Sequence, residues 1–103
     1  MDVSVIIVNY NTLGLTSDCI ESIIAQTSTV EYEIILVDNA STDGSKEVFA
    51  QDKRIKYIYS DQNLGFGRAN NLGIREAKGR YLFFLNSDTI LLNNAVKLLS
   101  LIH

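Results

Sequence analysis

The sequence predicts an α/β protein with a Rossmann-like parallel sheet and helices on both faces. Four short apolar segments, at residues 3–8, 33–37, 55–59 and 80–85, alternate with four segments of helical period. Such alternation is typical of βαβ units, whose right-handed crossovers keep neighbouring strands parallel. The predicted strand order is 3-2-1-4, with the topological switch between the first and fourth strands.

The residue types in each apolar segment predict its place in the sheet. Segments 3–8, 33–37 and 80–85 are almost continuously apolar and rich in Val, Ile, Leu and Phe. Strands of a parallel sheet that are covered on both faces have this composition. Segment 55–59 alternates more regularly and contains Lys56, which indicates an edge strand.

Apolar spacing predicts the first two helices. One face of a helix that runs to about residue 27 carries Leu15, Cys19, Ile20, Ile23 and Ile24. Ser41 is the predicted N-cap of the second helix, because its hydroxyl can accept a bond from a free amide of the first turn. Val48 and Phe49 are the expected apolar contribution of that helix.

The third and fourth helices are predicted in the same way. Ala69, Leu72, Gly73 and Ala77 share one face of the third, and Gly79 is the expected left-handed C-cap. Asn93 or Asn94 is the expected cap of the fourth helix. Its inward-facing residues are predicted to be Ala95, Val96, Leu98, Leu99 and Ile102.

Composition excludes several classes of function. The chain has 103 residues, enough for a single domain, with 9 basic and 12 acidic side chains and a net charge of −3. The absence of a basic cluster argues against nucleic-acid binding. The single histidine is the last residue, His103, which argues against catalytic triads and histidine-ligated zinc.

Cysteine content and the amino terminus bear on location. Cys19 is the only cysteine, so no internal disulfide forms, as is usual in a reducing compartment. Residues 1–3 lack the charge and apolar stretch of a signal peptide, and the apolar runs are too short to cross a bilayer. We expect a cytoplasmic location, with peripheral association at the inner face of the membrane as a further possibility.

Polar clusters follow all four predicted strands and share one edge of the sheet. Ligands of open α/β sheets bind outside the carboxyl ends of the strands, at the switch point. Ordinary loop chemistry also places polar residues there, so spacing has to distinguish a site from a set of turns. The clusters lie at residues 9–11, 38–44, 61–68 and 86–89.

Two carboxylates are the main candidates at this edge. Asp38 directly follows a strand, where it can accept hydrogen bonds from the base or ribose of a nucleotide; its alternative is capping, for which Ser41 is better placed. Asp88 lies where a diphosphate is expected and can hold Mg²⁺ or Mn²⁺, which often bind one or two carboxylates together with phosphate oxygens and water. The alternative for Asp88 is a turn or cap. We expect the two carboxylates to converge across one crevice.

Three further features allow two interpretations each. Segment 65–70 is superficially like a dinucleotide-binding fingerprint, but it ends in Asn70 and follows the third strand instead of the first. Arg68 faces either a ligand or solvent. Tyr10 either stacks on a base or forms an apolar lid.

Four motifs occur in order along the chain: VSVIIVNYN at 3–11, VDNASTDGS at 37–45, NLGFG with ANN at 63–71, and FLNSDT at 84–89. With these motifs the chain resembles family 2 glycosyltransferases with a GT-A fold. The DNAS and NSDT sequences resemble the rhamnosyltransferase-like branch. The resemblance covers the whole chain and is specific for the family but not for the substrate.

The resemblance implies a nucleoside-diphosphate-sugar donor and a divalent cation, Mg²⁺ or Mn²⁺. The Asp-x-Asp motif of the family falls on Asn86, Ser87 and Asp88, so Asp88 alone supplies a charge to the metal. Asp38 is implied to bind the base. The other implied donor-binding residues are Asn9, Tyr10, Asn11, Asn39, Asn63, Gly65 and Arg68, together with Asn86 and Ser87.

The family also implies an inverting transfer to an acceptor hydroxyl, on a saccharide or a lipid-linked acceptor, as in polysaccharide biosynthesis. The catalytic domain of the family is longer, and no residue here matches its general base. We therefore interpret residues 1–103 as a donor-binding part that is inactive alone, with its catalytic residues unknown. The missing part of the sheet leaves an exposed edge, which predicts a homo-oligomer.

Other functional classes remain as alternatives. A non-catalytic nucleotide-binding or interaction module on the same half-fold shares the same polar residues. A phosphoacceptor receiver domain needs an acidic pair after the first strand, where this chain has Asn9 and Asn11. A nucleotidyltransferase needs a basic, glycine-rich loop there, which is absent.

Overall fold

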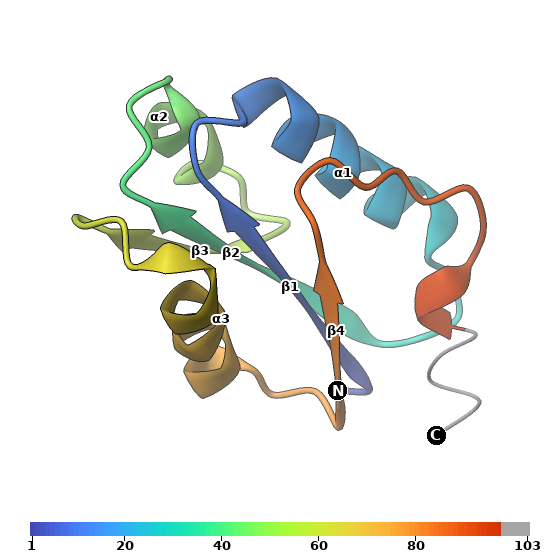
Figure 1. Ribbon diagram of the computed structural model, residues 1–103. Helices are drawn as coiled ribbons and strands as arrows, with labels where there is room; N and C mark the ends of the chain where they lie inside the picture. Colours follow the sequence, from blue (N-terminus) through green and yellow to red (C-terminus); the bar gives the residue numbers. More distant parts are fainter. Residues whose placement is uncertain (98–103) are drawn as a thin grey trace.

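The computed structural model describes residues 1–97 and shows one four-stranded sheet between two helical layers (Figure 1). Helices α1 and α2 lie on one face of the sheet and α3 lies on the other. The elements in chain order are β1 (Val3–Asn9), α1 (Leu13–Gln26), β2 (Tyr32–Asn39), α2 (Ser45–Phe49), β3 (Lys56–Ser60), α3 (Gly65–Glu76) and β4 (Tyr81–Leu85).

All strand pairs are parallel, and the order is β3-β2-β1-β4, which confirms the predicted topology. β3 is an edge strand, as its alternating pattern indicated. Strands β1 and β2 are longer than predicted at their carboxyl ends and pair Asn9 with Asp38. Polar residues expected in loops are therefore the last residues of buried strands.

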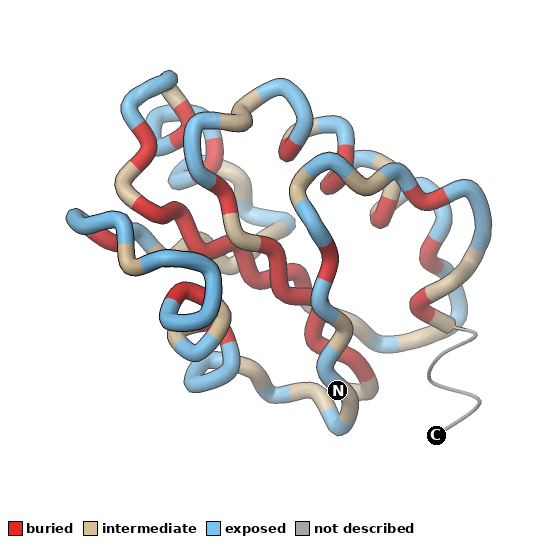
Figure 2. Tube along the Cα trace, viewed as in Figure 1, coloured by how far each residue is buried: buried red, intermediate tan, exposed pale blue. Residues whose placement is uncertain are grey.

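The strands alternate their side chains between two apolar cores. Val5, Ile7 and Leu36 pack against α1 and α2, whereas Ile6 and Val37 pack against α3. Figure 2 shows the buried residues concentrated along β1 and β2, the two inner strands. Burial on both faces explains their nearly continuous apolar sequence.

The prediction for the start of the second helix is wrong. Helix α2 begins at Ser45, after Gly44 in a left-handed conformation (φ 93°), and Ser41 does not cap it. Asp43 Oδ1 instead accepts the Ser45 amide at 3.1 Å. The expected apolar pair is also divided, because Phe49 is buried and Val48 is exposed.

The prediction for Gly79 is also wrong. Helix α3 ends at Glu76 with an extended C-cap, and the left-handed glycines are Gly44 and Gly65. Gly79 is required for another reason: an added Cβ would collide with the backbone nitrogen of Ser4 and lie 2.6 Å from the carbonyl carbon of Val3. The Gly79 amide also donates to Ser4 Oγ at 2.8 Å.

The predicted fourth helix lies partly outside the described residues. Residues 95–97 are helical, and Val96 is buried in the core beside α1 as expected. Leu98, Leu99 and Ile102 lie beyond the described part of the chain. Within residues 1–97, no helix has the length and apolar character needed to cross a membrane.

Replacing Gly79 by Ala tests the close approach of this turn to β1. We expect the free energy of unfolding to fall by about 2 kcal/mol or more, because the colliding atoms belong to the backbone and cannot move aside. Urea unfolding measures the change. Gly67→Ala is the matched control, since a Cβ there meets nothing within 4 Å. An unchanged stability of the Gly79 variant would contradict the assignment.

Candidate functional site

A cleft of about 570 Å³ opens at the carboxyl edge of the sheet, at the predicted switch between β1 and β4. It is bordered by the ends of β1, β2 and β4, the start of α1 and the loop before α3. Its lining residues are Val8, Tyr10, Thr12, Leu15, Asn39, Asn63, Gly65, Phe66, Asn86, Ser87 and Asp88. Seven predicted site residues are among them: Tyr10, Asn39, Asn63, Gly65, Asn86, Ser87 and Asp88.

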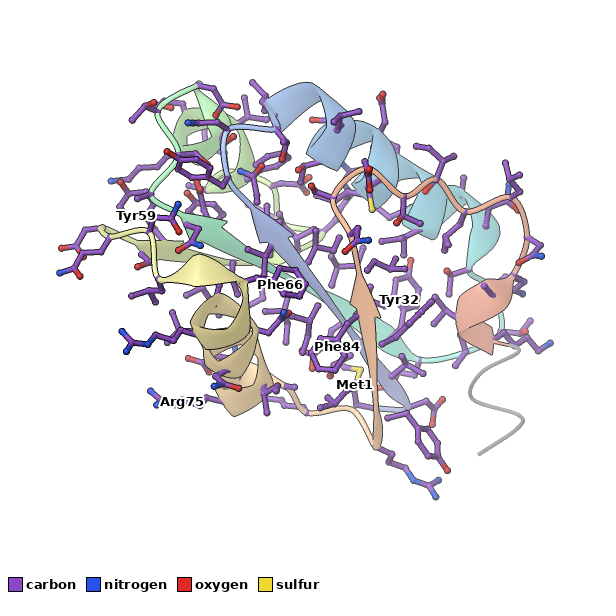
Figure 3. All side chains as sticks on the ribbon, viewed as in Figure 1. Met1, Tyr32, Tyr59, Phe66, Arg75 and Phe84 are labelled. Atoms are coloured by element: carbon purple, nitrogen blue, oxygen red, sulfur yellow. The ribbon has the colours of Figure 1, made fainter. Side chains whose placement is uncertain are left out.

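Three large apolar side chains line the cleft while remaining exposed. Tyr10 is 49% exposed, Leu15 51% and Phe66 59%. In the view of Figure 3, Phe66 extends from the first turn of α3 toward β4. Leu15 was expected in the core; it instead lies on the cleft side of α1. Apolar surface at a concave site is available to a planar ligand group.

Asn39 holds the loop before α3 in place. Its Oδ1 accepts the Leu64 amide at 2.7 Å, and its Nδ2 donates to Asn63 Oδ1 at 2.9 Å. Asn63 Oδ1 also accepts the Gly65 amide at 2.9 Å. Gly65 has φ 79°, a value that glycine adopts without strain. These bonds fix the part of the loop from which Phe66 projects.

Asp38 does not reach the cleft, contrary to expectation. It is fully buried, its Oδ2 accepts the Tyr57 hydroxyl at 2.5 Å, and its Oδ1 accepts the Ser41 amide at 3.1 Å. Because β2 continues to Asn39, successive side chains point to opposite faces of the sheet. Asp38 therefore faces the α1 and α2 layer, and Asn39 faces the cleft. The expected convergence of Asp38 with Asp88 across one crevice is wrong.

Three other predicted residues also lie outside the cleft lining. Asn9 is fully buried beneath the cleft. Asn11 is left-handed (φ 52°), and its Oδ1 accepts the Thr42 amide at 2.7 Å, so it joins the loops after β1 and β2. Arg68 is exposed on α3 and is not a lining residue, which favours the solvent-facing alternative.

Asn9 is the centre of a buried hydrogen-bond network. Its Nδ2 donates to Ser41 Oγ at 3.2 Å, and its Oδ1 accepts the hydroxyls of Thr12 at 2.7 Å and Thr16 at 3.0 Å. The Thr12 hydroxyl lies 3.3 Å from Ser87 Oγ, in the loop after β4. Both polar atoms of the Asn9 side chain therefore have hydrogen-bond partners within the chain.

The loop after β4 presents the only predicted metal ligand, Asp88, whose residue is exposed at the cleft. The Asn86 carbonyl accepts the Thr89 amide at 3.0 Å, which closes a turn around Ser87 and Asp88. Among residues 1–97, no three acidic, histidine or cysteine side chains form a ready cation site. One carboxylate with neighbouring amide and hydroxyl oxygens nevertheless fits Mg²⁺ or Mn²⁺ that retains phosphate and water ligands.

Cys19 supports this loop from below. Its thiol is buried in the core and lies 3.8 Å from the Asn86 carbonyl oxygen, to which it donates. Burial, and to a smaller extent the charge of Asp88, raises the pKa of the thiol from 9.0 to about 11. The thiol is therefore protonated at neutral pH and acts as a packing group.

Comparison with known proteins identifies the family. The model of the family described as glycosyl transferase family 2 matches residues 4–100. The chain belongs to glycosyl transferase family 2. This confirms the resemblance to family 2 that the four motifs indicated, whereas the rhamnosyltransferase-like branch stays a prediction.

Two curated relatives illustrate the extent of the match. Glycosyltransferase GlyG of Streptococcus pneumoniae is 38% identical over 101 residues, and the alignment covers 94% of this chain and 33% of GlyG. Putative teichuronic acid biosynthesis glycosyltransferase TuaG of Bacillus subtilis is 39% identical over 90 residues, covering 84% and 35%. The chain spans about a third of the length of either relative.

Solved structures confirm the GT-A fold. S. aureus TarS 1-349 in complex with UDP superposes with a TM-score of 0.86 at 25% identity, covering 98% of this chain and 31% of the TarS 1-349 chain. The mannosyltransferase PcManGT of Pyrobaculum calidifontis, in complex with GDP-Man and Mn²⁺, gives a TM-score of 0.82 at 24% identity, covering 92% and 30%. The second likeness concerns the fold alone.

Sequence reasoning missed four lining residues of this family 2 chain: Val8, Thr12, Leu15 and Phe66. Phe66 lies within the NLGFG motif, between two glycines. A large aromatic side chain between two glycines could have been predicted to line the cleft. Thr12 directly follows the polar residues after β1. Val8 and Leu15 gave no signal, because apolar residues in a strand and a helix are ordinarily core.

The raised pKa of Cys19 predicts a pH dependence of stability. Below pH 9 the thiol is protonated in both the folded and the unfolded chain; between pH 9 and 11 only the unfolded chain loses the proton, which favours unfolding. We expect the wild-type chain to lose on the order of 2 kcal/mol more than Cys19→Ala over this interval. Urea unfolding at pH 8 and pH 11 measures both, and parallel pH profiles would contradict the assignment.

Proposed function

We propose that this chain is the donor-binding part of an inverting glycosyltransferase and binds a nucleoside-diphosphate sugar in the cleft. The observation that carries the proposal is the composition of that one cleft. Exposed aromatic side chains, Tyr10 and Phe66, line it together with the carboxylate of Asp88. A nucleoside diphosphate has a planar base at one end and a cation-binding diphosphate at the other, so it matches both features.

The nucleoside is assigned to the side of the cleft near the ends of β1 and β2. Tyr10 provides a ring on which a base stacks, an interaction that every base can make. Asn39 and Asn63 keep the neighbouring loop, and with it Phe66, in place. The complex of TarS with UDP supports a nucleotide ligand for a chain of this fold.

The diphosphate is assigned to the side formed by Asn86, Ser87 and Asp88. Asp88 would hold Mg²⁺ or Mn²⁺, with the side-chain oxygens of Asn86 and Ser87 beside it. When bound, the cation neutralises charge on the diphosphate leaving group. The residues of this chain therefore bind and orient the donor.

Transfer requires a further group. An acceptor hydroxyl attacks the anomeric carbon, the bond from that carbon to the diphosphate oxygen breaks, and a base removes the hydroxyl proton. We assign no base among the described residues, 1–97. We therefore propose that the chain binds donor but does not transfer sugar alone, and that the acceptor is a saccharide or lipid-linked hydroxyl.

The cellular setting is proposed from the relatives. TuaG is named for teichuronic acid biosynthesis, and another relative is named a poly(ribitol-phosphate) beta-glucosyltransferase. These names favour a role in polysaccharide biosynthesis, and we propose a cytoplasmic location for it. Edge strand β4 exposes the apolar side chains of Leu82 and Phe84. We propose that a second copy of the chain pairs with this strand. Sedimentation that shows only monomer at high concentration would refute this pairing.

A non-catalytic nucleotide-binding module is the second candidate. It is favoured by the same absence of an assigned base and predicts the same donor binding. Sugar transfer after addition of the remaining part of a relative such as GlyG, fused at the end of the match, distinguishes the two. A fused enzyme that remains inactive while binding donor and acceptor favours the module.

Calorimetric titration with UDP and GDP, with and without Mn²⁺, tests donor binding directly. We expect Mn²⁺ to increase the affinity, and Asp88→Asn to reduce the affinity in Mn²⁺ by roughly tenfold or more, because a charged ligand is lost. Asp18→Asn is the control, since Asp18 is an exposed carboxylate of α1 outside the cleft lining. Equal affinities for wild type and Asp88→Asn in Mn²⁺ would refute the metal assignment.

A further inference from the structure

The hydroxyl of Thr12 links the end of β1 to the loop after β4, two segments that border the cleft. It donates to Asn9 Oδ1 at the end of β1, and it lies 3.3 Å from Ser87 Oγ in the loop after β4. It also contacts the hydroxyl of Thr16, one turn further along α1, at 3.0 Å. Ser87 directly precedes the proposed cation ligand, Asp88.

The Asn9 end of this link is rigid. Asn9 is fully buried at the end of an inner strand, and Ser41 and Thr16 fix its amide from both sides. Ser41 is in turn bound through its backbone amide to Asp38, and Asp38 to Tyr57. The hydrogen bonds thus continue from β3 across β2 and β1 to Thr12.

The Ser87 end is less constrained. Asn86 and Asp88 are exposed, and the loop follows an edge strand that has a partner on one side only. Among the described residues, the Asn86 turn, the Cys19 thiol beneath it and the contact between Ser87 and Thr12 hold residues 86–89. The next described anchor along the loop is the Leu91 amide, which donates to Ser22 Oγ at 2.9 Å. A loop held by few bonds has more freedom to place a carboxylate incorrectly.

Capping of α1 does not account for Thr12. Thr12 occupies the N-cap position, but its side chain makes no capping hydrogen bond. The first amide of the helix, that of Leu13, instead donates to Asp43 Oδ2 at 2.9 Å. The Thr12 hydroxyl is therefore directed to the network and to Ser87.

We propose that Thr12 is a positioning residue that transmits the fixed geometry of Asn9 to Ser87 and so places Asp88 for the cation and diphosphate. The inference rests on the proposed function of the cleft and assigns Thr12 a role in it. Groups that orient a metal ligand change metal affinity by about 10–100-fold when removed. Thr12 acts in this way through the loop and not as a ligand itself.

Thr12→Val tests the proposal, because valine keeps the shape and loses only the hydroxyl. Calorimetry with UDP is performed on the whole chain with and without Mn²⁺. We expect the variant to retain metal-free affinity within about twofold and to lose most of the gain from Mn²⁺, roughly tenfold. Thr12→Ser, which keeps the hydroxyl, is expected to restore the gain.

Thr16→Val is the matched control. It removes a hydroxyl from the same buried network, one that contacts Asn9 and Thr12 but makes no described contact with Ser87. We expect it to lower stability like Thr12→Val but to keep most of the response to Mn²⁺, because Ser41 and Thr12 still hold Asn9. An equal loss of that response in both threonine variants would overturn the specific role of Thr12.

A second measurement needs no ligand. In amide NMR spectra of the free chain, Thr12→Val should shift or broaden the signals of residues 86–88, whereas Thr16→Val should leave them nearly unchanged. Unchanged 86–88 signals in Thr12→Val would overturn the proposal, whether or not UDP binds.

The outcomes separate the two hypotheses. If the wild-type chain binds neither UDP nor GDP, the proposed function fails, and the assignment of Thr12 to it fails as well. If wild type binds and responds to Mn²⁺ but Thr12→Val responds equally, only the positioning role fails. A loss of metal-free affinity as large as the loss in Mn²⁺ identifies Thr12 as a direct ligand and also overturns that role.

Discussion

The conformation of the sheet at the carboxyl ends of its strands depends on hydrogen bonds to two polar side chains that are buried at the ends of the inner strands. Asp38 and Asn9 are paired in the register of β1 and β2, and neither is exposed. A carboxylate or amide buried without partners destabilises a fold by several kcal/mol. Tyr57, Ser41 and two threonines provide those partners. Both strands therefore continue to the floor of the cleft, which remains a stiff support.

That support determines what the cleft presents. Asn39, the next residue of β2, faces the cleft and holds the loop that carries Phe66, while Tyr10 follows directly after β1. The aromatic side of the cleft is therefore attached to the two inner strands. Asp88 belongs to the loop of an edge strand, and its support is a bond between hydroxyls and a thiol beneath a carbonyl group. The cation side is consequently the part of the site most sensitive to single substitutions.

The sequence predicted the topology because apolar period and strand composition are properties of the whole segment. It did not predict where the strands end, and an extension of two residues in β2 was enough to turn Asp38 inward and Asn39 toward the cleft. Local patterns also misassigned Ser41 and Gly79, because the role of each depends on a residue that is distant in the sequence. Ser41 Oγ accepts a hydrogen bond from Asn9, and the Gly79 amide donates to Ser4 Oγ. Thr12 and Leu15 required the packing of α1 against the sheet edge, which no local pattern contains.

The central claim is that one cleft holds a nucleotide between an aromatic wall and a single carboxylate. A crystal structure of the chain with UDP and Mn²⁺ tests it most directly. The account predicts the uracil ring against Tyr10 and the cation bound to Asp88 and the diphosphate, with Asp38 still buried on Tyr57. UDP outside the cleft, or a cation held without Asp88, would contradict it.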